Sequence, residues 1–205
     1  MKIKENILSY FHKKSKLGLL SDFLFIAILL AMVFPQSRMW LISNVNKAKI
    51  FFVQPSVIEA DKAVSLSADD YQLLFTDLNN NNLDFSLLKG KVIFLNFWAT
   101  WCPPCVAEMP SIQKLYNAYR NNNQIAFILL TNEEKTKVKT FLQKQGYDFP
   151  VFFNQDRIPE VLSTNSIPTT FLISKSGKLV IKEIGASDWA GNRVKTEIEK
   201  LLKEE

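Results

Sequence analysis

Two cysteines separated by two prolines, Cys102-Pro103-Pro104-Cys105, are the feature that most restricts the local structure of this sequence. A near-continuous apolar run, Lys91–Phe97, precedes them, as is typical of a central buried strand. Apolar residues at helical spacing follow them, which predicts a helix over 103–119. The sequence therefore places the cysteine pair between a buried strand and a helix. The residues on one side of that helix are Val106, Met109, Ile112, Leu115 and Tyr116.

The chain after residue 70 continues to alternate between strand-like and helix-like segments. Asparagine tolerates left-handed turns, so the run Asn79–Asn82 predicts a β-hairpin. Strands that alternate with helices and end in a hairpin predict an α/β fold with a mixed central sheet flanked by helices. The segments are a first hairpin of 72–78 and 83–88, a strand at 125–130, a helix at 135–145, a strand at 151–153, a short helix at 157–162, a second hairpin of 169–174 and 179–184, and a helix at 194–202.

The N-terminal region differs from the rest in charge and hydropathy. The first twenty residues carry five lysines against Glu5, whereas the other 185 residues carry a net charge of only +1, taken from a total of +5. This distribution argues against a nucleic-acid-binding face and suits a tail beside an anionic membrane surface. Residues 17–34 are mostly apolar and would span about 27 Å as a helix, close to the thickness of a bilayer core.

Lysines before the apolar segment predict that the N-terminus stays cytoplasmic and that the body of the protein is exported. An uncleaved anchor is favoured because no Ala-x-Ala-like site follows Phe34, although a cleaved signal peptide stays open. The predicted division is a basic cytoplasmic tail at 1–16, a transmembrane anchor at 17–34, a tether at 35–68 and a folded domain at 69–205.

The spacing of the two cysteines favours redox chemistry over a structural disulfide. Closing so small a loop removes only about 2 kcal/mol of unfolded-state entropy, against about 4.7 kcal/mol for a 100-residue loop. A helix N-terminus stabilises a thiolate, which is the attacking species in disulfide exchange. We therefore assign Cys102 as the attacking sulfur and Cys105 as the resolving sulfur. Pro103 and Pro104 offer no N–H to a Cys102 thiolate, which favours a more reducing pair.

The segment WATWCPPC after an apolar strand resembles the thioredoxin superfamily. Ile167-Pro168-Thr169 resembles the cis-proline loop of that family, and Pro110 matches the kink in its long helix. The N-terminal segment, the hairpin and Glu108-Met109-Pro110 resemble the TlpA/ResA-like branch. This resemblance implies a thioredoxin-like fold in a thiol–disulfide oxidoreductase tethered to the bacterial inner (cytoplasmic) membrane, with its catalytic domain on the periplasmic or extracytoplasmic side. It also implies a reductant of protein disulfides, for example in cytochrome c maturation.

One position departs from the cytosolic thioredoxins, which carry a buried acid six residues before the first cysteine. Asn96 stands there, so we expect Glu108 to manage the proton of Cys105 or Cys102. The alternative is that Glu108 only complements the helix N-terminus. We assign the client-binding surface to Trp101, Pro103, Pro104, Ile167 and Pro168, with Pro168 in the cis form.

No third cysteine exists, so electrons must pass between this pair and a partner. The resemblance suggests a membrane-embedded dithiol carrier as donor and a disulfide-bearing client protein as acceptor. We expect a monomer that needs no cofactor and no metal. A copper chaperone that uses the two thiolates is the alternative, but its relatives have a wider cysteine spacing and a distal histidine, which are absent here. A non-catalytic docking domain also stays open, as does the choice between reduction and isomerisation.

Overall fold

The computed structural model describes residues 15–33, 54–59, 62–154 and 156–204. The chain divides into two units, Met1–Ile42 and Ser43–Glu205, and each is described by itself. In the first unit, helix α2 spans Lys16–Val33. None of the helices within the described residues combines the length and the apolar character needed to cross a membrane. The predicted tail and most of the predicted tether lie outside the described residues.

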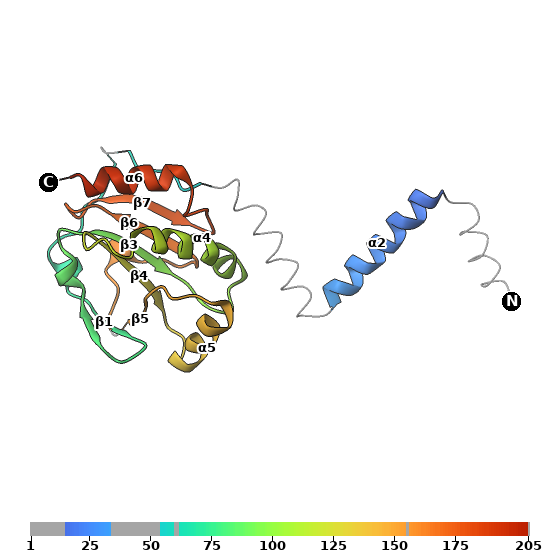
Figure 1. The fold of residues 1–205 in the computed structure, drawn as a ribbon, viewed down its shortest axis with the longest axis horizontal. Coiled ribbons are helices and arrows are strands. Elements are labelled where there is room, and N and C mark those ends of the chain that lie inside the picture. Colours follow the sequence, from blue (N-terminus) through green and yellow to red (C-terminus); the bar gives the residue numbers. More distant parts are fainter. Residues whose placement is uncertain (1–14, 34–53, 60–61, 155, 205) are drawn as a thin grey trace. The chain divides into compact units, whose positions relative to one another are not determined.

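The second unit is built on a seven-stranded mixed sheet with the strand order β2-β1-β5-β4-β3-β6-β7 (Figure 1). Strands β3, β4 and β5 run parallel, and the other neighbouring pairs are antiparallel. The mixed α/β fold expected from the sequence is therefore confirmed. The elements are β1 (Leu74–Asp77), β2 (Asn82–Asp84), β3 (Val92–Phe97), α4 (Pro103–Tyr119), β4 (Ile125–Thr131), α5 (Lys135–Gln145), β5 (Val151–Asn154), β6 (Thr169–Ile173), β7 (Leu179–Ile184) and α6 (Asn192–Leu202).

The predicted N-terminal hairpin is confirmed, with a shorter second strand than expected. Its turn contains Asn80 in the left-handed region, at a φ of 66°. Residues Phe85–Leu88 form a 3-10 helix after β2, so the expected strand over 83–88 ends early. The expected helix at 157–162 is wrong, because only Glu160–Leu162 forms a 3-10 turn. Pro159 lies inside that segment, and a proline disfavours the helical conformation of the residue before it.

The two faces of the sheet carry separate apolar clusters, as the alternation along β3 shows. Val92 and Phe94 join the cluster that contains residues of α4, α5 and α6. Ile93 and Leu95 join the opposite cluster, which the 3-10 helices and the segment before β1 help to cover. Because side chains alternate along a strand, Asn96 follows Phe94 onto the face covered by α4.

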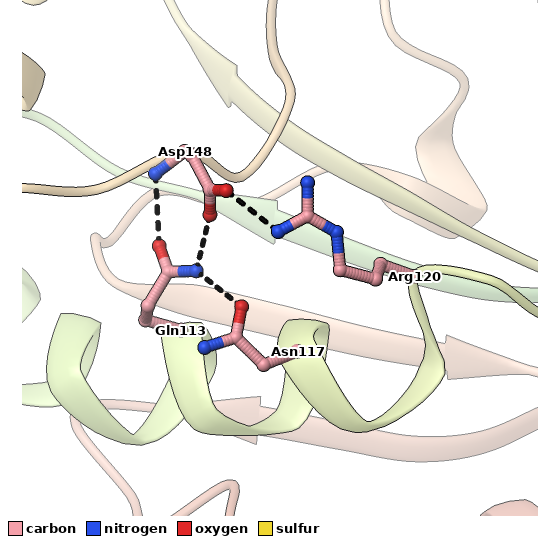
Figure 2. Close-up of polar contacts among 4 residues, drawn as sticks. All are labelled: Gln113, Asn117, Arg120 and Asp148. Carbon is pink, nitrogen blue, oxygen red and sulfur yellow. Dashed lines mark hydrogen bonds and ion pairs between the residues drawn. The ribbon is translucent and has the colours of Figure 1, made fainter.

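A polar network fastens the surface of α4 to the loop before β5 (Figure 2). The Asp148 carboxylate accepts from Arg120 Nη1 and from Gln113 Nε2, at 2.6 Å in both cases. Gln113 also donates to Asn117 Oδ1 and accepts from the Asp148 N–H. These contacts hold the loop that follows α5 against the long helix, and α4 starts at the cysteine pair.

The end of the predicted tether pairs with the sheet. Ile58 N donates to the Val180 carbonyl at 2.8 Å, and Leu66 N donates to the Gly177 carbonyl at 2.9 Å. Leu179 N in turn donates to the Val64 carbonyl at 2.8 Å. This segment therefore covers the outer edge of β7, which would otherwise expose unpaired backbone groups.

Candidate active site

The two cysteines form a disulfide at the N-terminus of α4. Cys102 is the N-cap residue of the helix, and its Sγ accepts a hydrogen bond from Cys105 N at 3.3 Å. Pro103 and Pro104 occupy the first two helical positions, so Cys105 is the first helical residue with an N–H to donate. Cys102 is 3% exposed and Cys105 is fully buried, so the sulfur assigned as the attacker is the more accessible of the two.

The loop before β6 faces the disulfide. The Ile167–Pro168 peptide bond is cis, as expected from the sequence. The Ile167 carbonyl oxygen lies 3.7 Å from Cys102 Sγ, although these residues are 65 positions apart. Pro168 is buried, and its carbonyl accepts from Gly185 N at 2.9 Å. The structure therefore brings Ile167 and Pro168 together with the cysteine pair.

Two tryptophans flank this site with opposite environments. Trp98 is 2% exposed and packs against Phe141 and Phe149, so it belongs to the core. Trp101, directly before Cys102, is 58% exposed. Trp101 and Ile167 line a cavity of about 360 Å³ together with Phe97, Leu130 and Ile158. Apolar side chains are thus available beside the disulfide for contact with another molecule.

Glu108 is fully buried under the disulfide-bearing turn of α4. Its Oε1 accepts from Asn96 Nδ2 at 2.9 Å. Its Oε2 accepts from Ser187 N at 3.2 Å and from Trp189 Nε1 at 3.0 Å. Burial raises the pKa of Glu108 from 4.5 to about 8, even though these three donors favour the carboxylate and lower the pKa.

The position of Glu108 bears on its two predicted roles. Its donors come from β3 and from the loop after β7, so the carboxylate does not act as a solvated complement to the helix N-terminus. Cys105 lies three residues earlier on the same helix, and residues at that spacing share a face. The arrangement suits a proton acceptor on the inner side of the cysteine pair.

Glu133 is a residue of the site that the sequence did not identify. Both the N–H and the hydroxyl of Thr100 donate to its carboxylate, and Lys137 pairs with it at 2.6 Å. Burial raises the pKa of Glu133, but Lys137 and the Thr100 donors outweigh this and lower it overall. Glu133 therefore anchors the loop two residues before Cys102.

One topological signal could have indicated this contact. Thr100 follows β3 and Glu133 follows β4, and the carboxyl ends of adjacent parallel strands meet at the same edge of a sheet. No comparable signal predicts that Ser187 and Trp189 contact Glu108. Their loop follows β7, so its approach to Glu108 depends on the position of β7 in the sheet.

The described residues offer little support for a metal centre. Within 15–33, 54–59, 62–154 and 156–204, no group of three or more His, Cys, Asp or Glu residues is placed to hold a metal ion. The copper-binding alternative therefore gains no third ligand from this part of the chain. The chemistry that the arrangement offers is reversible exchange between a disulfide and two thiols, with a buried carboxyl nearby.

Comparison with known proteins agrees with this chemistry. The Redoxin family profile matches residues 59–202. The thiol-disulfide oxidoreductase ResA of Geobacillus kaustophilus is 35% identical over 153 residues, which cover 74% of this chain and 81% of that protein. ResA of Bacillus cereus is 38% identical over 128 residues, or 62% of this chain and 74% of that protein.

Solved structures support the fold. A putative protein disulfide isomerase from Bacteroides thetaiotaomicron matches with a TM-score of 0.57 at 24% identity, over 74% of this chain and 94% of that one. A putative thiol:disulfide interchange protein DsbE from Chlorobium tepidum matches with a TM-score of 0.54 at 22% identity, over 63% of this chain and 92% of that one. The chain belongs to the Redoxin family, as a TlpA/ResA-like thiol–disulfide oxidoreductase of the thioredoxin superfamily.

Proposed function

We propose that this protein reduces disulfides of client proteins outside the cytoplasm by cycling the Cys102–Cys105 pair. The observation that carries the proposal is the placement of Cys102 Sγ between the N–H of Cys105 and the carbonyl of Ile167. The Cys105 N–H stabilises a thiolate at Cys102. The cis-proline loop places backbone beside Cys102 Sγ, where a client segment would bind. Pro103 and Pro104 withhold two further donors, which keeps the thiolate less stabilised and the pair more reducing.

The cycle starts from the dithiol. The Cys102 thiolate attacks one sulfur of the client disulfide, which forms a mixed disulfide and releases the other client sulfur as a thiolate. Cys105 gives its proton to the Glu108 carboxylate and attacks Cys102 Sγ. This step reforms the Cys102–Cys105 disulfide and releases the second client thiolate. Two electrons pass to the client, whose thiolates then take up two protons.

Glu108 suits the role of proton acceptor for Cys105 in that cycle. Its pKa of about 8 is close to the ordinary value of about 8.5 for a cysteine, so a proton moves between the two at small cost. We expect Glu108→Gln to change the pH dependence of Cys105 alkylation. Unchanged alkylation and an unchanged reductase rate would show that Glu108 has no part in proton transfer.

The client-binding surface comprises Trp101, Pro103, Pro104, Ile167 and Pro168. Trp101 supplies exposed apolar area next to the attacking sulfur, and Ile167 leads from the sulfur to the neighbouring cavity. An extended client segment would pair with the backbone at Ile167 and place an apolar side chain in that cavity. This arrangement favours clients that are locally unfolded, such as an apocytochrome c before haem attachment.

We further propose that the N-terminal region holds the domain at the bacterial cytoplasmic membrane, with the N-terminus cytoplasmic and the catalytic domain periplasmic. The support comes from the sequence, in which a basic tail precedes the mostly apolar residues 17–34. A membrane-embedded dithiol carrier would then reduce the pair again, and the enzyme would act as a monomer. Alkaline extraction of membranes should leave the full chain in the pellet; recovery of the intact chain in the supernatant would refute the anchor.

The proposed reductase activity is tested with insulin and dithiothreitol at neutral pH. We expect the wild type to accelerate insulin precipitation and Cys102→Ala to abolish the effect. Cys105→Ala should accumulate a mixed disulfide at Cys102, because the resolving sulfur is gone. Full activity in Cys102→Ala would contradict the proposal. When Cys105→Ala is produced in cells, mass spectrometry of the proteins trapped at Cys102 would identify the clients.

A further inference from the structure

Asn96 stands in contact with the buried carboxyl of Glu108, where only part of its own hydrogen-bonding capacity is used. Its Nδ2 donates to Glu108 Oε1 at 2.9 Å and to Thr170 Oγ1 at 2.8 Å. Its Oδ1 is buried and has no partner among the described residues. Asn96 and Thr170 also lie directly opposite each other in the β3–β6 register, so the backbone fixes their spacing.

This orientation of the amide fits only one protonation state of Glu108. A carboxylate accepts hydrogen bonds, and an amide nitrogen donates them. When Glu108 takes up a proton, Oε2 already accepts from Ser187 N and Trp189 Nε1, so the proton goes to Oε1. The new O–H then points at the Asn96 Nδ2 group, and two donors face each other in a dry environment.

A half-turn of the amide removes that conflict. Oδ1 would then accept from the Glu108 O–H and from the Thr170 hydroxyl, because a hydroxyl both donates and accepts. The amide makes two hydrogen bonds in either orientation and leaves one of its atoms unpaired. We propose that Asn96 is a positioning residue whose amide reverses when Glu108 changes protonation state, donating to the carboxylate and accepting from the carboxylic acid.

This inference deepens the proposed function, on which it rests, by saying how one buried site accommodates both the charged and the neutral carboxyl during a cycle. The groups that donate to the Glu108 carboxyl, from β3 and from the loop after β7, are the neutral groups of Asn96, Ser187 and Trp189. On β6, the neutral hydroxyl of Thr170 bonds Asn96. The charged group that acts on Glu108 is Glu183 of β7, which raises the pKa further. The cysteines on α4 do not titrate in the disulfide form.

The test uses the full-length oxidised protein, in which Glu108 titrates without interference from the thiols. NMR follows the Glu108 side-chain carboxyl carbon and the Asn96 side-chain amide between pH 5 and pH 10. We expect the amide signals to shift with the same midpoint as the carboxyl, and their cross-relaxation contacts to Thr170 to change across it. Amide signals that stay fixed while Glu108 titrates, or a Glu108 that does not titrate in this range, would overturn the proposal.

Variants sharpen the result. Asn96→Leu removes one donor to the carboxylate, so the Glu108 midpoint should rise by about one to two pH units. Thr170→Val removes one bond from each orientation and should leave the midpoint near that of the wild type. Ser187→Ala removes a buried hydroxyl that has no hydrogen-bond partner among the described residues, and it should also leave the Glu108 midpoint unchanged. A midpoint that moves in Ser187→Ala and not in Asn96→Leu would assign the switch to Ser187 and refute it for Asn96.

The reductase rate is measured separately on the reduced proteins. The titration of the oxidised wild type tests the amide reversal even if a variant fails to fold or the protein proves to be an isomerase. A coupled titration without insulin reduction would therefore sink the proposed reductase function and keep the inference about Asn96.

Discussion

A single buried carboxyl accounts for most of the unusual electrostatics of the site. Water is excluded from Glu108, and three donors restore only part of the hydration that burial removes. The proton affinity of Glu108 is thereby brought close to that of a thiol. A carboxyl on the surface, with an ordinary pKa near 4.3, would be a poor acceptor for a thiol proton at neutral pH.

The raised pKa predicts how stability depends on pH. Its folded-state value of about 8 exceeds the value of 4.5 for the exposed group, so Glu108 favours the folded state most below pH 4.5. That contribution is lost progressively as the pH rises from 4.5 to about 8. The thermal midpoint of the oxidised wild type should therefore fall more between pH 5 and pH 8 than that of Glu108→Gln. Differential scanning calorimetry at several pH values measures these midpoints, with the exposed Glu134→Gln as control. Parallel dependence of the midpoint on pH in the wild type and in Glu108→Gln would contradict the prediction.

Glu133 predicts a different kind of effect, on the geometry of the redox loop. Glu133→Gln removes the negative charge, so the hydrogen bonds from Thr100 are no longer charge-assisted and the loop before Cys102 loses part of its anchor. We expect the insulin reduction rate to fall several-fold while the protein stays folded by circular dichroism. Lys137→Gln keeps both Thr100 contacts and should change the rate little. Equal rates in the wild type and Glu133→Gln would remove Glu133 from the positioning of the site.

Elements with local start and stop signals could be predicted from the sequence. Helix α5 ends at Gln145 as expected, because Gly146 adopts a left-handed conformation with a φ of 70°. The secondary structure of segment 157–162 could not be predicted from such signals, because Pro159 interrupts a helical pattern. The cysteine pair and the cis-proline loop were predictable from short motifs. The contacts of Glu108 were not, because its partners lie 12 to 81 residues away along the chain. The Glu133–Thr100 contact joins residues 33 positions apart, and only the pairing of β3 with β4 could have indicated it.

Gly146 provides a test at the level of one helix. Its Cβ position is open, so only the backbone conformation penalises a side chain there. Gly146→Ala should lower the free energy of unfolding by about 1 kcal/mol, and Gly146→Asn by less, because asparagine tolerates this conformation. Urea denaturation measures both. An alanine variant as stable as the wild type would show that the end of α5 adapts at no cost.

At the scale of the whole molecule, the catalytic unit contains every residue assigned to the chemistry. The boundary between the two units falls at Ile42, well before the segment that pairs with β7. A chain that begins at Ser43 should therefore keep the thermal midpoint and the insulin reduction rate of the full protein, and should lose the proposed membrane association. Calorimetry and the reductase assay on the two chains check this, and a much lower midpoint would show that residues 1–42 belong to the fold.

Measuring the redox equilibrium of the Cys102–Cys105 pair tests the proposed reducing dithiol most directly. The full-length protein is equilibrated with graded glutathione redox buffers, and the alkylated thiols are counted by mass spectrometry. We predict a reversible two-electron transition, with about 30 mV for each tenfold change in the ratio and a midpoint nearer to about −270 mV than to the −120 mV of strong oxidants. A pair that stays oxidised and inert in every buffer, or one whose midpoint matches the strong oxidants, would contradict a reducing dithiol.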